Sequence, residues 1–385
     1  MQIIQLKQFL DLFAPKQKQF RSPTLPQFVE IATVRIGNKL EPLSEYMKRK
    51  AISIKTIEVL LHNIMTRNEY LTRFYNLSLS IRADKMHIHD SNVAPMKSRH
   101  MSNNVEILYK NFIRNIHFKD ILQNTTSGIE NVPTFLNVLV DLYTKFIIDY
   151  KLLTPSATFY IHNGRIGSVF SSYYFRASIM NPYLVYSLNQ SILHGTRIFT
   201  PTLGWSSYCY GFLECPDVVE YVGTDVIPSV CNKTRELAAL YPQKRLIDIY
   251  CVPSEDLSKD RQFMKKYKEH FDVVYFSPPY FKLEMYEGKE QSTSRYGDYN
   301  EWLQKYWEET IKMCSHVLTK QGKMCYILSG YGSQSSKQQY DLLTDMNRIA
   351  KKYFVLKSTQ QMYNKNVHVS DHRPTDERIM FFMKK

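Results

Sequence analysis

Two patterns of hydrophobic positions divide the chain. In the first part, apolar residues recur three and four positions apart, most clearly over residues 55–77 and again over 134–153. That spacing predicts amphipathic helices, so we expect residues 1–153 to form a mainly helical region. Between two β-prone runs at 158–170, the pair Asn163-Gly164 is a strong short-range signal for a β-hairpin.

From about residue 195 onward, short apolar runs alternate with helical stretches. Seven runs qualify as strands: 196–200, 220–225, 246–251, 271–276, 323–328, 352–358 and 378–384. Alternation of this kind predicts βαβ units and a mostly parallel sheet with helices on both faces. In such sheets, ligands bind beyond the carboxyl ends of the strands, near the point where the strand order reverses. We therefore expect the chemistry in the loops that follow the first four strands.

Length and composition fit a globular protein of about two domains. The chain has 385 residues, 44% of them hydrophobic, and a domain typically has roughly 150 residues. Six cysteines without a CxxC pair give no disulfide or zinc framework, which favours a reducing compartment. The first residues lack the build of a signal peptide, and no run approaches the ~20 apolar residues of a membrane-spanning helix. The sequence thus predicts a soluble, intracellular protein with no membrane partner.

The charge is strongly positive and unevenly distributed. The formal net charge is +14. Residues 1–198 hold 24 basic and 13 acidic side chains, whereas residues 199–385 hold 26 and 23. A basic surplus suits a polyanionic partner, because each phosphate that is neutralised releases condensed counterions. The basic first half is therefore the candidate region for binding nucleic acid.

The segment Ser277-Pro278-Pro279-Tyr280 directly follows the strand expected at 271–276. Two consecutive prolines fix φ and remove two amide donors, which gives a rigid turn whose carbonyls can face a ligand. The Ser277 hydroxyl and the Pro278 carbonyl are then acceptors for an amino group, and Tyr280 offers a flat face for stacking. These four residues can therefore hold an amino group.

This segment resembles motif IV of the amino-methyltransferases, the [D/N/S]PP[Y/F] signature of enzymes that methylate exocyclic nitrogens of adenine or cytosine in DNA. The resemblance implies an α/β fold, a Rossmann-like class I methyltransferase domain. Its sheet is seven-stranded and mostly parallel, with an antiparallel last strand, and is preceded here by the helical N-terminal region. It also implies S-adenosylmethionine as the cofactor, and it implies that Ser277, Pro278, Pro279 and Tyr280 are catalytic.

The segment 198–206 looks like the cofactor loop of that family, with two departures. Thr200 stands where the family usually has an acidic residue, and Ser206 stands where it has a glycine. Asp225 ends the next strand about 20 residues later, a spacing at which a carboxylate can accept the ribose hydroxyls of a nucleoside. The resemblance gives cofactor contacts to Arg176, Thr200, Thr202, Gly204, Trp205, Asp225, Glu255 and Asp256.

Three of these assignments have further grounds and alternatives. Arg176 belongs to a segment, 175–183, that looks like motif X of the family, which contacts the cofactor's carboxylate; a surface ion pair is the other interpretation. Glu255 and Asp256 stand where the family has an acidic residue at the adenine edge. Ser254-Glu255-Asp256 equally fits a solvated helix N-cap.

Long polar segments near the corner are candidates for substrate binding. One covers 287–298 after the Pro-Pro turn, and another covers 364–378 between the last two strands. Long loops in compact domains are usually lids or binding loops. The residues expected to contact substrate are Phe281, Tyr286, Arg295, Tyr296 and Arg373. The histidines of the second loop lack metal-ligand spacing, so we expect no metal.

Together these features predict a site-specific DNA methyltransferase that acts on cytosine N4 or adenine N6 of a flipped base. An RNA adenine-N6 methyltransferase and a catalytically inactive nucleic-acid-binding relative remain alternatives. The expected domains are a helical recognition region at 1–153, a hairpin and motif X-like helix at 154–198, and the catalytic domain at 199–385.

Overall fold

The computed structural model describes residues 1–14, 22–82, 86–163, 165–241, 245–329, 340–363 and 377–385. Contacts divide the chain into two compact units. The helical unit comprises residues 2–80 and 118–178, and the sheet unit comprises residue 1 with residues 81–117 and 179–385. Both units are discontinuous in sequence, unlike the expected domains at 1–153, 154–198 and 199–385. The difference arises because residues 81–117 pack with the sheet.

The sheet unit is built on seven strands in the order β11-β12-β10-β8-β5-β6-β7. Their bounds are β5 Arg197–Thr200, β6 Glu220–Thr224, β7 Leu246–Tyr250, β8 Phe271–Phe276, β10 Leu318–Ser329, β11 Phe354–Gln361 and β12 Glu377–Lys384. Neighbouring strands from β10 through β8, β5 and β6 to β7 are parallel, and β12 is antiparallel to both β10 and β11. This confirms the predicted fold class and all seven predicted strands.

The order in which strands are added to the sheet reverses between β5 and β8, although the two strands are parallel. Successive strands β5, β6 and β7 extend one way from β5, and β8 then pairs on the other side of β5. The loops after these strands therefore meet at one edge, where such sheets bind ligands. We call this edge, defined by the loops after Thr200, Thr224, Tyr250 and Phe276, the carboxyl edge.

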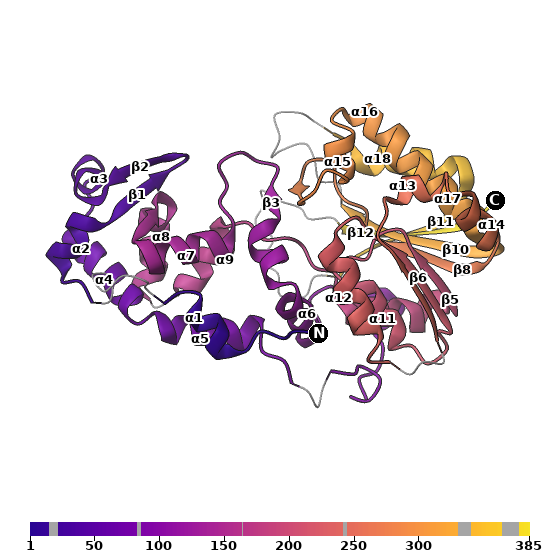
Figure 1. The fold of residues 1–385 in the computed structure, drawn as a ribbon, viewed down its shortest axis with the longest axis horizontal. Coiled ribbons are helices and arrows are strands. Elements are labelled where there is room, and N and C mark those ends of the chain that lie inside the picture. The colour runs from indigo at the N-terminus through magenta and orange to yellow at the C-terminus, as the bar shows by residue number, and fades with distance from the viewer. Residues whose placement is uncertain (15–21, 83–85, 164, 242–244, 330–339, 364–376) are drawn as a thin grey trace. The chain divides into compact units, whose positions relative to one another are not determined.

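Helices cover both faces of this sheet, with α11 and α12 on one side and α17 and α18 on the other (Figure 1). Their bounds are α6 Leu108–Ile116, α10 Pro182–Leu188, α11 Ser207–Leu213, α12 Pro228–Ala238, α13 Ser254–Leu257, α14 Arg261–Lys266, α15 Ser292–Arg295, α16 Tyr299–Trp302, α17 Glu309–Val317 and α18 Leu342–Tyr353. The described residues of the unit also form the 3₁₀ helix η3 Ser98–His100, the π-helical segments η6 Asn189–Leu193 and η7 Leu303–Glu308, and the two-residue strand β9 Glu284–Met285.

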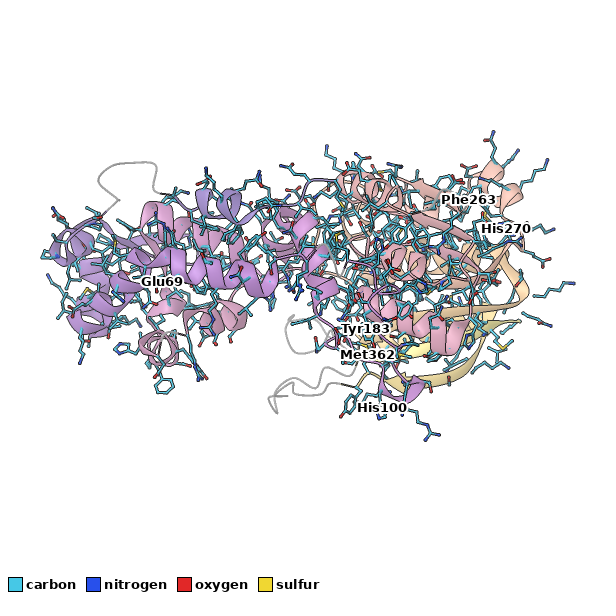
Figure 2. The ribbon with its side chains drawn as sticks, turned by 90° about the horizontal axis from the view of Figure 1, so that it is seen from below. Glu69, His100, Tyr183, Phe263, His270 and Met362 are labelled. Atoms are coloured by element: carbon cyan, nitrogen blue, oxygen red, sulfur yellow. The ribbon has the colours of Figure 1, made fainter. Side chains whose placement is uncertain are left out.

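Residues before the sheet are joined to it by specific contacts. The Asn181 side chain, which begins α10, donates to the Val105 carbonyl at 2.6 Å, and the rings of Tyr109 and Tyr183 stack at 6.2 Å. At the end of β11, the Tyr363 amide donates to the Met101 carbonyl. In Figure 2 Tyr183, Met362 and His100 lie at the same end of the sheet unit. These contacts explain why 81–117 belongs to this unit.

The helical unit confirms the mainly helical prediction and adds a small sheet in the order β2-β1-β4. Its helices are α1 Leu6–Asp11, α2 Leu25–Ile31, α3 Leu43–Lys50, α4 Ile54–Met65, α5 Arg67–Ser78, α7 Phe135–Lys145, α8 Pro155–His162 and α9 Ile166–Tyr173, with the turns η4 Asp120–Asn124 and η5 Tyr150–Leu153. Its strands are β1 Thr33–Ile36, β2 Lys39–Pro42, β3 Thr126–Ser127 and β4 Ile147–Asp149.

Two local predictions in this unit are wrong. The expected hairpin at 158–170 is instead the pair of helices α8 and α9. Thr154 caps α8 by accepting from the Ala157 amide at 3.3 Å, and Pro155 occupies its first turn, so a strong helix start lies just before the expected strand. The helix expected through 134–153 stops at Phe146, which takes a left-handed conformation, and β4 follows.

Candidate functional site

The loop after β5 turns through three consecutive residues in the left-handed region. Gly204, Trp205 and Ser206 have φ of +52°, +59° and +68°. A Cβ on Gly204 would lie 2.3 Å from the Tyr208 ring, so only glycine fits at this position. The turn brings the chain directly into α11, whose second residue is Tyr208.

Ser206 shows how this chain tolerates the departure from glycine. A left-handed non-glycine residue costs about 1–2 kcal/mol. The Ser206 hydroxyl is fully buried and lies 2.9 Å from Nε2 of His117 and 2.7 Å from the Thr234 hydroxyl. Two buried hydrogen bonds of about 1 kcal/mol each offset that cost. Sequence reasoning missed His117, which lies far from the loop in sequence.

Thr200 is sealed inside the sheet. Its side chain is fully buried, and its hydroxyl lies 2.7 Å from the Tyr221 hydroxyl on the neighbouring strand. Tyr221 is itself fully buried. Thr200 thus packs beneath the loop, and the cofactor contact expected of it stays a prediction.

Asp225 clamps two loops of the carboxyl edge together. Its Oδ2 accepts from the Leu203 amide at 3.1 Å, and its Oδ1 accepts from the amides of Val226 at 2.8 Å and Ile227 at 3.1 Å. Burial raises the pKa of Asp225, and these three backbone hydrogen bonds oppose the rise. The carboxylate therefore holds the loop after β5 against the loop after β6, with Thr202 beside the clamped amide.

A single tyrosine connects the cofactor-type loop to the Pro-Pro corner. The Tyr208 hydroxyl accepts from the Ser277 amide at 3.0 Å and lies 3.4 Å from the Ser277 carbonyl oxygen. Tyr208 is 2% exposed, and burial raises its pKa to about 12, so it is a neutral phenol at physiological pH. The ring that excludes any side chain at Gly204 therefore also holds the corner, which brings the two predicted motifs together.

The corner is anchored so that its polar groups keep one orientation. The Ser277 hydroxyl donates to the Ile327 carbonyl at 3.0 Å, which leaves its oxygen lone pairs as acceptors. The Tyr280 hydroxyl accepts from the Ser329 amide at 2.9 Å. Pro278 is buried, whereas Ser277, Pro279 and Tyr280 are partly exposed. The corner is thus fixed to β10 at both of its ends.

Glu255 and Asp256 begin α13 after β7, and Arg295 joins them. Nη1 of Arg295 lies 2.9 Å from Oε1 of Glu255, and Nη2 lies 3.1 Å from Oδ1 of Asp256. Burial raises the pKa of Glu255 to about 7. Burial would also raise the pKa of Asp256, but Arg295 and Lys259 outweigh it and the pKa is lowered.

The residues expected to contact substrate are mostly held within the unit. Arg295 is committed to the two carboxylates, and Tyr296 lies buried under its guanidinium at 5.4 Å. Phe281 is 3% exposed and packs against the rings of Tyr299, Trp302 and Tyr340. All three residues thus have partners within the unit, and their substrate contacts stay predictions.

Tyr286 lies closest to the predicted cofactor loop. Its ring is 5.9 Å from the Trp205 ring, and its hydroxyl donates to Glu284 at 2.7 Å. Arg176 belongs to the helical unit, where its guanidinium lies over the Phe135 ring at 5.9 Å and burial lowers its pKa. Arg373 falls outside the described residues, so its assignment stays a prediction.

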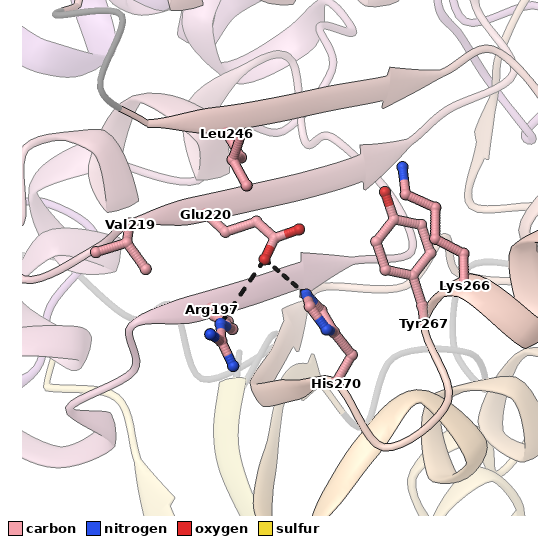
Figure 3. Close-up of a pocket in the computed structure, with 7 residues that line it drawn as sticks. All are labelled: Arg197, Val219, Glu220, Leu246, Lys266, Tyr267 and His270. Atoms are coloured by element: carbon pink, nitrogen blue, oxygen red, sulfur yellow. Dashed lines mark hydrogen bonds and ion pairs between the residues drawn. The ribbon is translucent and has the colours of Figure 1, made fainter.

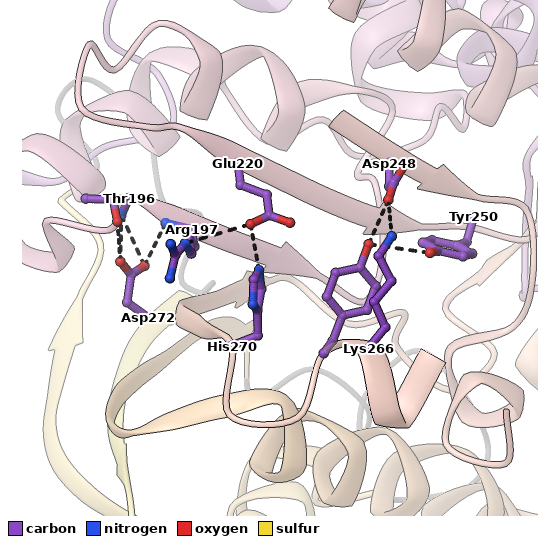
Figure 4. A network of polar contacts seen from close by, with 9 residues as sticks. Thr196, Arg197, Glu220, Asp248, Tyr250, Lys266, His270 and Asp272 are labelled. Atoms are coloured by element: carbon purple, nitrogen blue, oxygen red, sulfur yellow. Dashed lines mark hydrogen bonds and ion pairs between the residues drawn. The ribbon is translucent and has the colours of Figure 1, made fainter. Parts of the chain in front are cut away.

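The opposite edge of the sheet carries a polar network that the sequence did not indicate. A depression of about 380 Å³ there is lined by Arg197, Val219, Glu220, Leu246, Lys266, Tyr267 and His270 (Figure 3). Nε2 of His270 lies 2.6 Å from the nearly buried Glu220, and Lys266 pairs with Asp248 at 2.8 Å (Figure 4). Glu220 and Asp248 each have a basic partner, so these pairs join the beginning of β6 and the middle of β7 to the segment before β8.

Neither a metal cluster nor a membrane span is found in the described parts of the chain. No group of three or more His, Cys, Asp or Glu side chains there is arranged to hold a metal ion. No helix in those parts has both the length and the apolar character needed to cross a membrane.

Comparison with known proteins gives structural likeness without sequence relatives. No family model and no curated protein matches the chain. The N-methyltransferase NodS from Bradyrhizobium japonicum WM9, solved with S-adenosyl-L-homocysteine, is 10% identical, with a TM-score of 0.34 over 52% of this chain and 83% of its own. TrmN from Thermus thermophilus is 15% identical, with a TM-score of 0.35 over 53% and 49%.

A third similar structure is Trm1 from Pyrococcus horikoshii in complex with S-adenosyl-L-methionine. It is 12% identical, with a TM-score of 0.33 over 52% of this chain and 53% of its own. The matched part thus spans about half the length of TrmN and of Trm1. At these TM-scores the likenesses give no basis for assigning an activity, which must come from the site itself.

Proposed function

We propose that this protein transfers a methyl group from S-adenosylmethionine to an exocyclic amino nitrogen of a nucleobase in DNA, cytosine N4 or adenine N6. One observation carries the proposal. The Tyr208 hydroxyl joins the Ser277 corner to the Gly204 loop, and Asp225 joins that loop to the end of β6. The corner for an amino group and the loops for a nucleoside therefore share the carboxyl edge of one sheet.

The residues at this edge fit a nucleoside cofactor. The Ser207 hydroxyl, at the start of α11 directly after the left-handed loop, is fully buried and has no hydrogen-bond partner among the described residues. A buried hydroxyl of this kind is normally satisfied, which supports a ligand at the loop. Glu255, Asp225 and the Gly204 loop would hold the cofactor. When bound, the cofactor would supply a methyl group on a positively charged sulfur.

Ser277 and Pro278 would prepare the amino group for attack. An exocyclic NH2 is a poor nucleophile because its lone pair is conjugated with the ring. The Ser277 hydroxyl donates its hydrogen bond to the Ile327 carbonyl, so its lone pairs are available to accept from that NH2. The Pro278 carbonyl offers a second acceptor. Both hydrogen bonds favour tetrahedral nitrogen with a localised lone pair. Positioning thus supplies most of the catalysis, and no strong base is required.

Tyr280 would hold the base against this corner. Its hydroxyl is tethered to the Ser329 amide, so the ring keeps a fixed orientation. A base in a duplex cannot reach such a corner while stacked, so the mechanism requires base flipping, and the Tyr280 ring would stack on the extruded base. The motif resemblance favours cytosine, because relatives with serine in the first motif position tend to methylate cytosine N4.

A nucleic acid substrate is supported by charge. Residues 2–80 and 118–178, the helical unit, hold 17 basic and 10 acidic side chains. Phosphate contacts from this unit would supply sequence-independent affinity with a steep salt dependence. RNA has the same backbone charge, so methylation of adenine N6 in RNA is the alternative substrate within the same mechanism.

A catalytically inactive nucleic-acid-binding protein is the second candidate, and Asp225 is the observation that favours it. Both of its carboxylate oxygens already accept backbone amides, and Thr200 is sealed by Tyr221. Calorimetry with S-adenosylmethionine separates the candidates: no binding by a folded protein that still binds DNA supports the inactive alternative.

The direct experiment measures transfer of labelled methyl to matched DNA and RNA oligomers of mixed sequence. The proposal expects incorporation into DNA by the natural protein and none by Ser277→Ala. Incorporation into RNA alone selects the alternative substrate. Equal incorporation by both proteins refutes the role of Ser277, whose alanine variant must bind S-adenosylhomocysteine normally to show that it is folded.

A further inference from the structure

The hydroxyl of Tyr306 is buried and unpaired. The side chain is 3% exposed, and among the residues that the structure describes its oxygen has no hydrogen-bond partner. Buried polar groups in native proteins nearly always have a partner, because water is lost on burial and must be replaced. The described residues therefore leave this buried hydroxyl open to a partner that they do not supply.

Tyr306 lies in an unusual part of its helix. The segment η7, Leu303–Glu308, is π-helical and is inserted between α16 and α17. Single π-helical turns of this kind are uncommon and occur frequently at functional sites. The Tyr306 ring packs 5.2 Å from Trp302, whose indole N–H donates to the Ser292 hydroxyl at 3.0 Å. The direction of the phenol is thus set by packing.

The helical segment that carries the hydroxyl packs on the carboxyl edge, because η7 contacts α13, the helix that follows β7. Burial raises the pKa of Tyr306, and four further side chains add to the rise: Glu255, Cys314, Asp225 and Tyr208. Three of these belong to the segments after β7, β6 and β5, and only Cys314 lies on the helix that continues from Tyr306. The first of those segments is fixed against this helix, since the Ser254 hydroxyl lies 2.8 Å from the Thr310 hydroxyl.

We infer that the Tyr306 hydroxyl is a binding group for the nucleoside part of the cofactor, donating a hydrogen bond to it from the helical layer above the sheet. This inference rests on the proposed function. Asp225 and ionised Glu255 are acceptors on the sheet side and take the donors of a nucleoside. The ring nitrogens of a purine are acceptors and need a donor, which the Tyr306 phenol supplies. The acceptors on the sheet side and the Tyr306 donor on the helical side would then bind complementary groups of one ligand.

The test is Tyr306→Phe in the full chain, with Tyr143→Phe as the matched control. Tyr143 is likewise buried with a hydroxyl that lacks a partner among the described residues, but it lies on α7 of the helical unit. Titration calorimetry with S-adenosylhomocysteine and with 5′-methylthioadenosine measures binding, and thermal unfolding without ligand measures the fold.

Tyr306→Phe is expected to bind both probes about tenfold more weakly, the usual effect of one hydrogen bond. Its melting temperature without ligand should not fall, because the variant removes an unsatisfied group. Tyr143→Phe should bind both probes like the natural protein. A structural role for the hydroxyl predicts the reverse, a lower melting temperature with unchanged binding.

Three outcomes overturn the inference. If Tyr306→Phe binds both probes as tightly as the natural protein, the hydroxyl is no binding group, and the proposed function stands. If only S-adenosylhomocysteine is weakened, the contact is to the amino acid part and the nucleoside assignment is wrong. If the natural protein binds neither probe, the proposed function fails and this inference fails with it.

Discussion

Tyr208→Phe tests the connection on which the site depends. The substitution removes one hydroxyl and keeps the ring. The Ser277 amide loses its acceptor at 3.0 Å, and the Ser277 carbonyl loses a weaker contact at 3.4 Å. A buried amide left unpaired costs about 1–3 kcal/mol, so the free energy of unfolding should fall by that amount. A corner displaced by about 1 Å loses roughly 100-fold in rate.

The matched control is Tyr221→Phe, which removes a buried hydroxyl that lies 2.7 Å from Thr200 and does not touch the corner. Denaturant unfolding should show similar losses of stability for both variants. The rate of methyl transfer at saturating cofactor should collapse only for Tyr208→Phe. If both variants keep the natural rate, or lose it equally, the claim that Tyr208 positions the corner is wrong.

Three further predictions concern the same edge and the charge of the chain. Burial raises the pKa of Glu255 from 4.5 to about 7, so the protonated side chain favours the folded state, and this contribution is complete below pH 4.5 and lost as the pH rises through 7. The free energy of unfolding, measured against that of Glu255→Gln, should therefore shift by about 3 kcal/mol over that range. An unchanged difference between the two proteins contradicts the assignment. Gly204→Ala should destabilise the protein by about 2–4 kcal/mol and weaken cofactor binding, because the new Cβ meets the Tyr208 ring. Gly288→Ala is the control: its φ is +108° but the space around it is open, so a thermal melt should show the effect of backbone strain alone. DNA affinity in filter binding should fall steeply between 50 and 200 mM salt, by about 10³-fold or more for roughly six phosphate contacts; a flat salt response rules out phosphate binding by the helical unit.

Much of the sheet could be predicted because its signal is local and repeated. Each strand is a short apolar run bounded by polar turns, and a run such as 271–276 is buried along most of its length. Parallel strands require this pattern, since helices cover both faces. The Pro-Pro corner could be predicted equally well, because two prolines fix their φ angles whatever residues surround them.

The hairpin prediction is wrong because the signal of a two-residue turn competes with the helix signals of the neighbouring residues. The segments on both sides of Asn163-Gly164 can form either a strand or a helix. The Thr154 cap, with Pro155 in the first helical turn, stabilises the helix. A systematic search for such caps would have found it. The small sheet of the helical unit was missed because its strands have only three or four residues.

Side-chain partners across long separations were beyond sequence reasoning. The sequence predicts a substrate contact for Arg295, and only the fold shows that it pairs with Glu255 and Asp256 about 40 residues earlier. Phe281 follows the motif directly, and only the fold shows that Trp302 and its neighbours bury it. Tyr208 carries no motif of its own, although a tyrosine four positions after the left-handed glycine is now a feature that could be sought.

Sequencing for modified bases in DNA from cells that express this protein tests the central claim most directly. We predict N4-methylcytosine or N6-methyladenine at a fixed sequence with the natural protein, and none with Ser277→Ala produced at the same level. The same modification with both proteins, or none with a natural protein that binds S-adenosylmethionine and DNA, would contradict a methyl transfer centred on this proline corner.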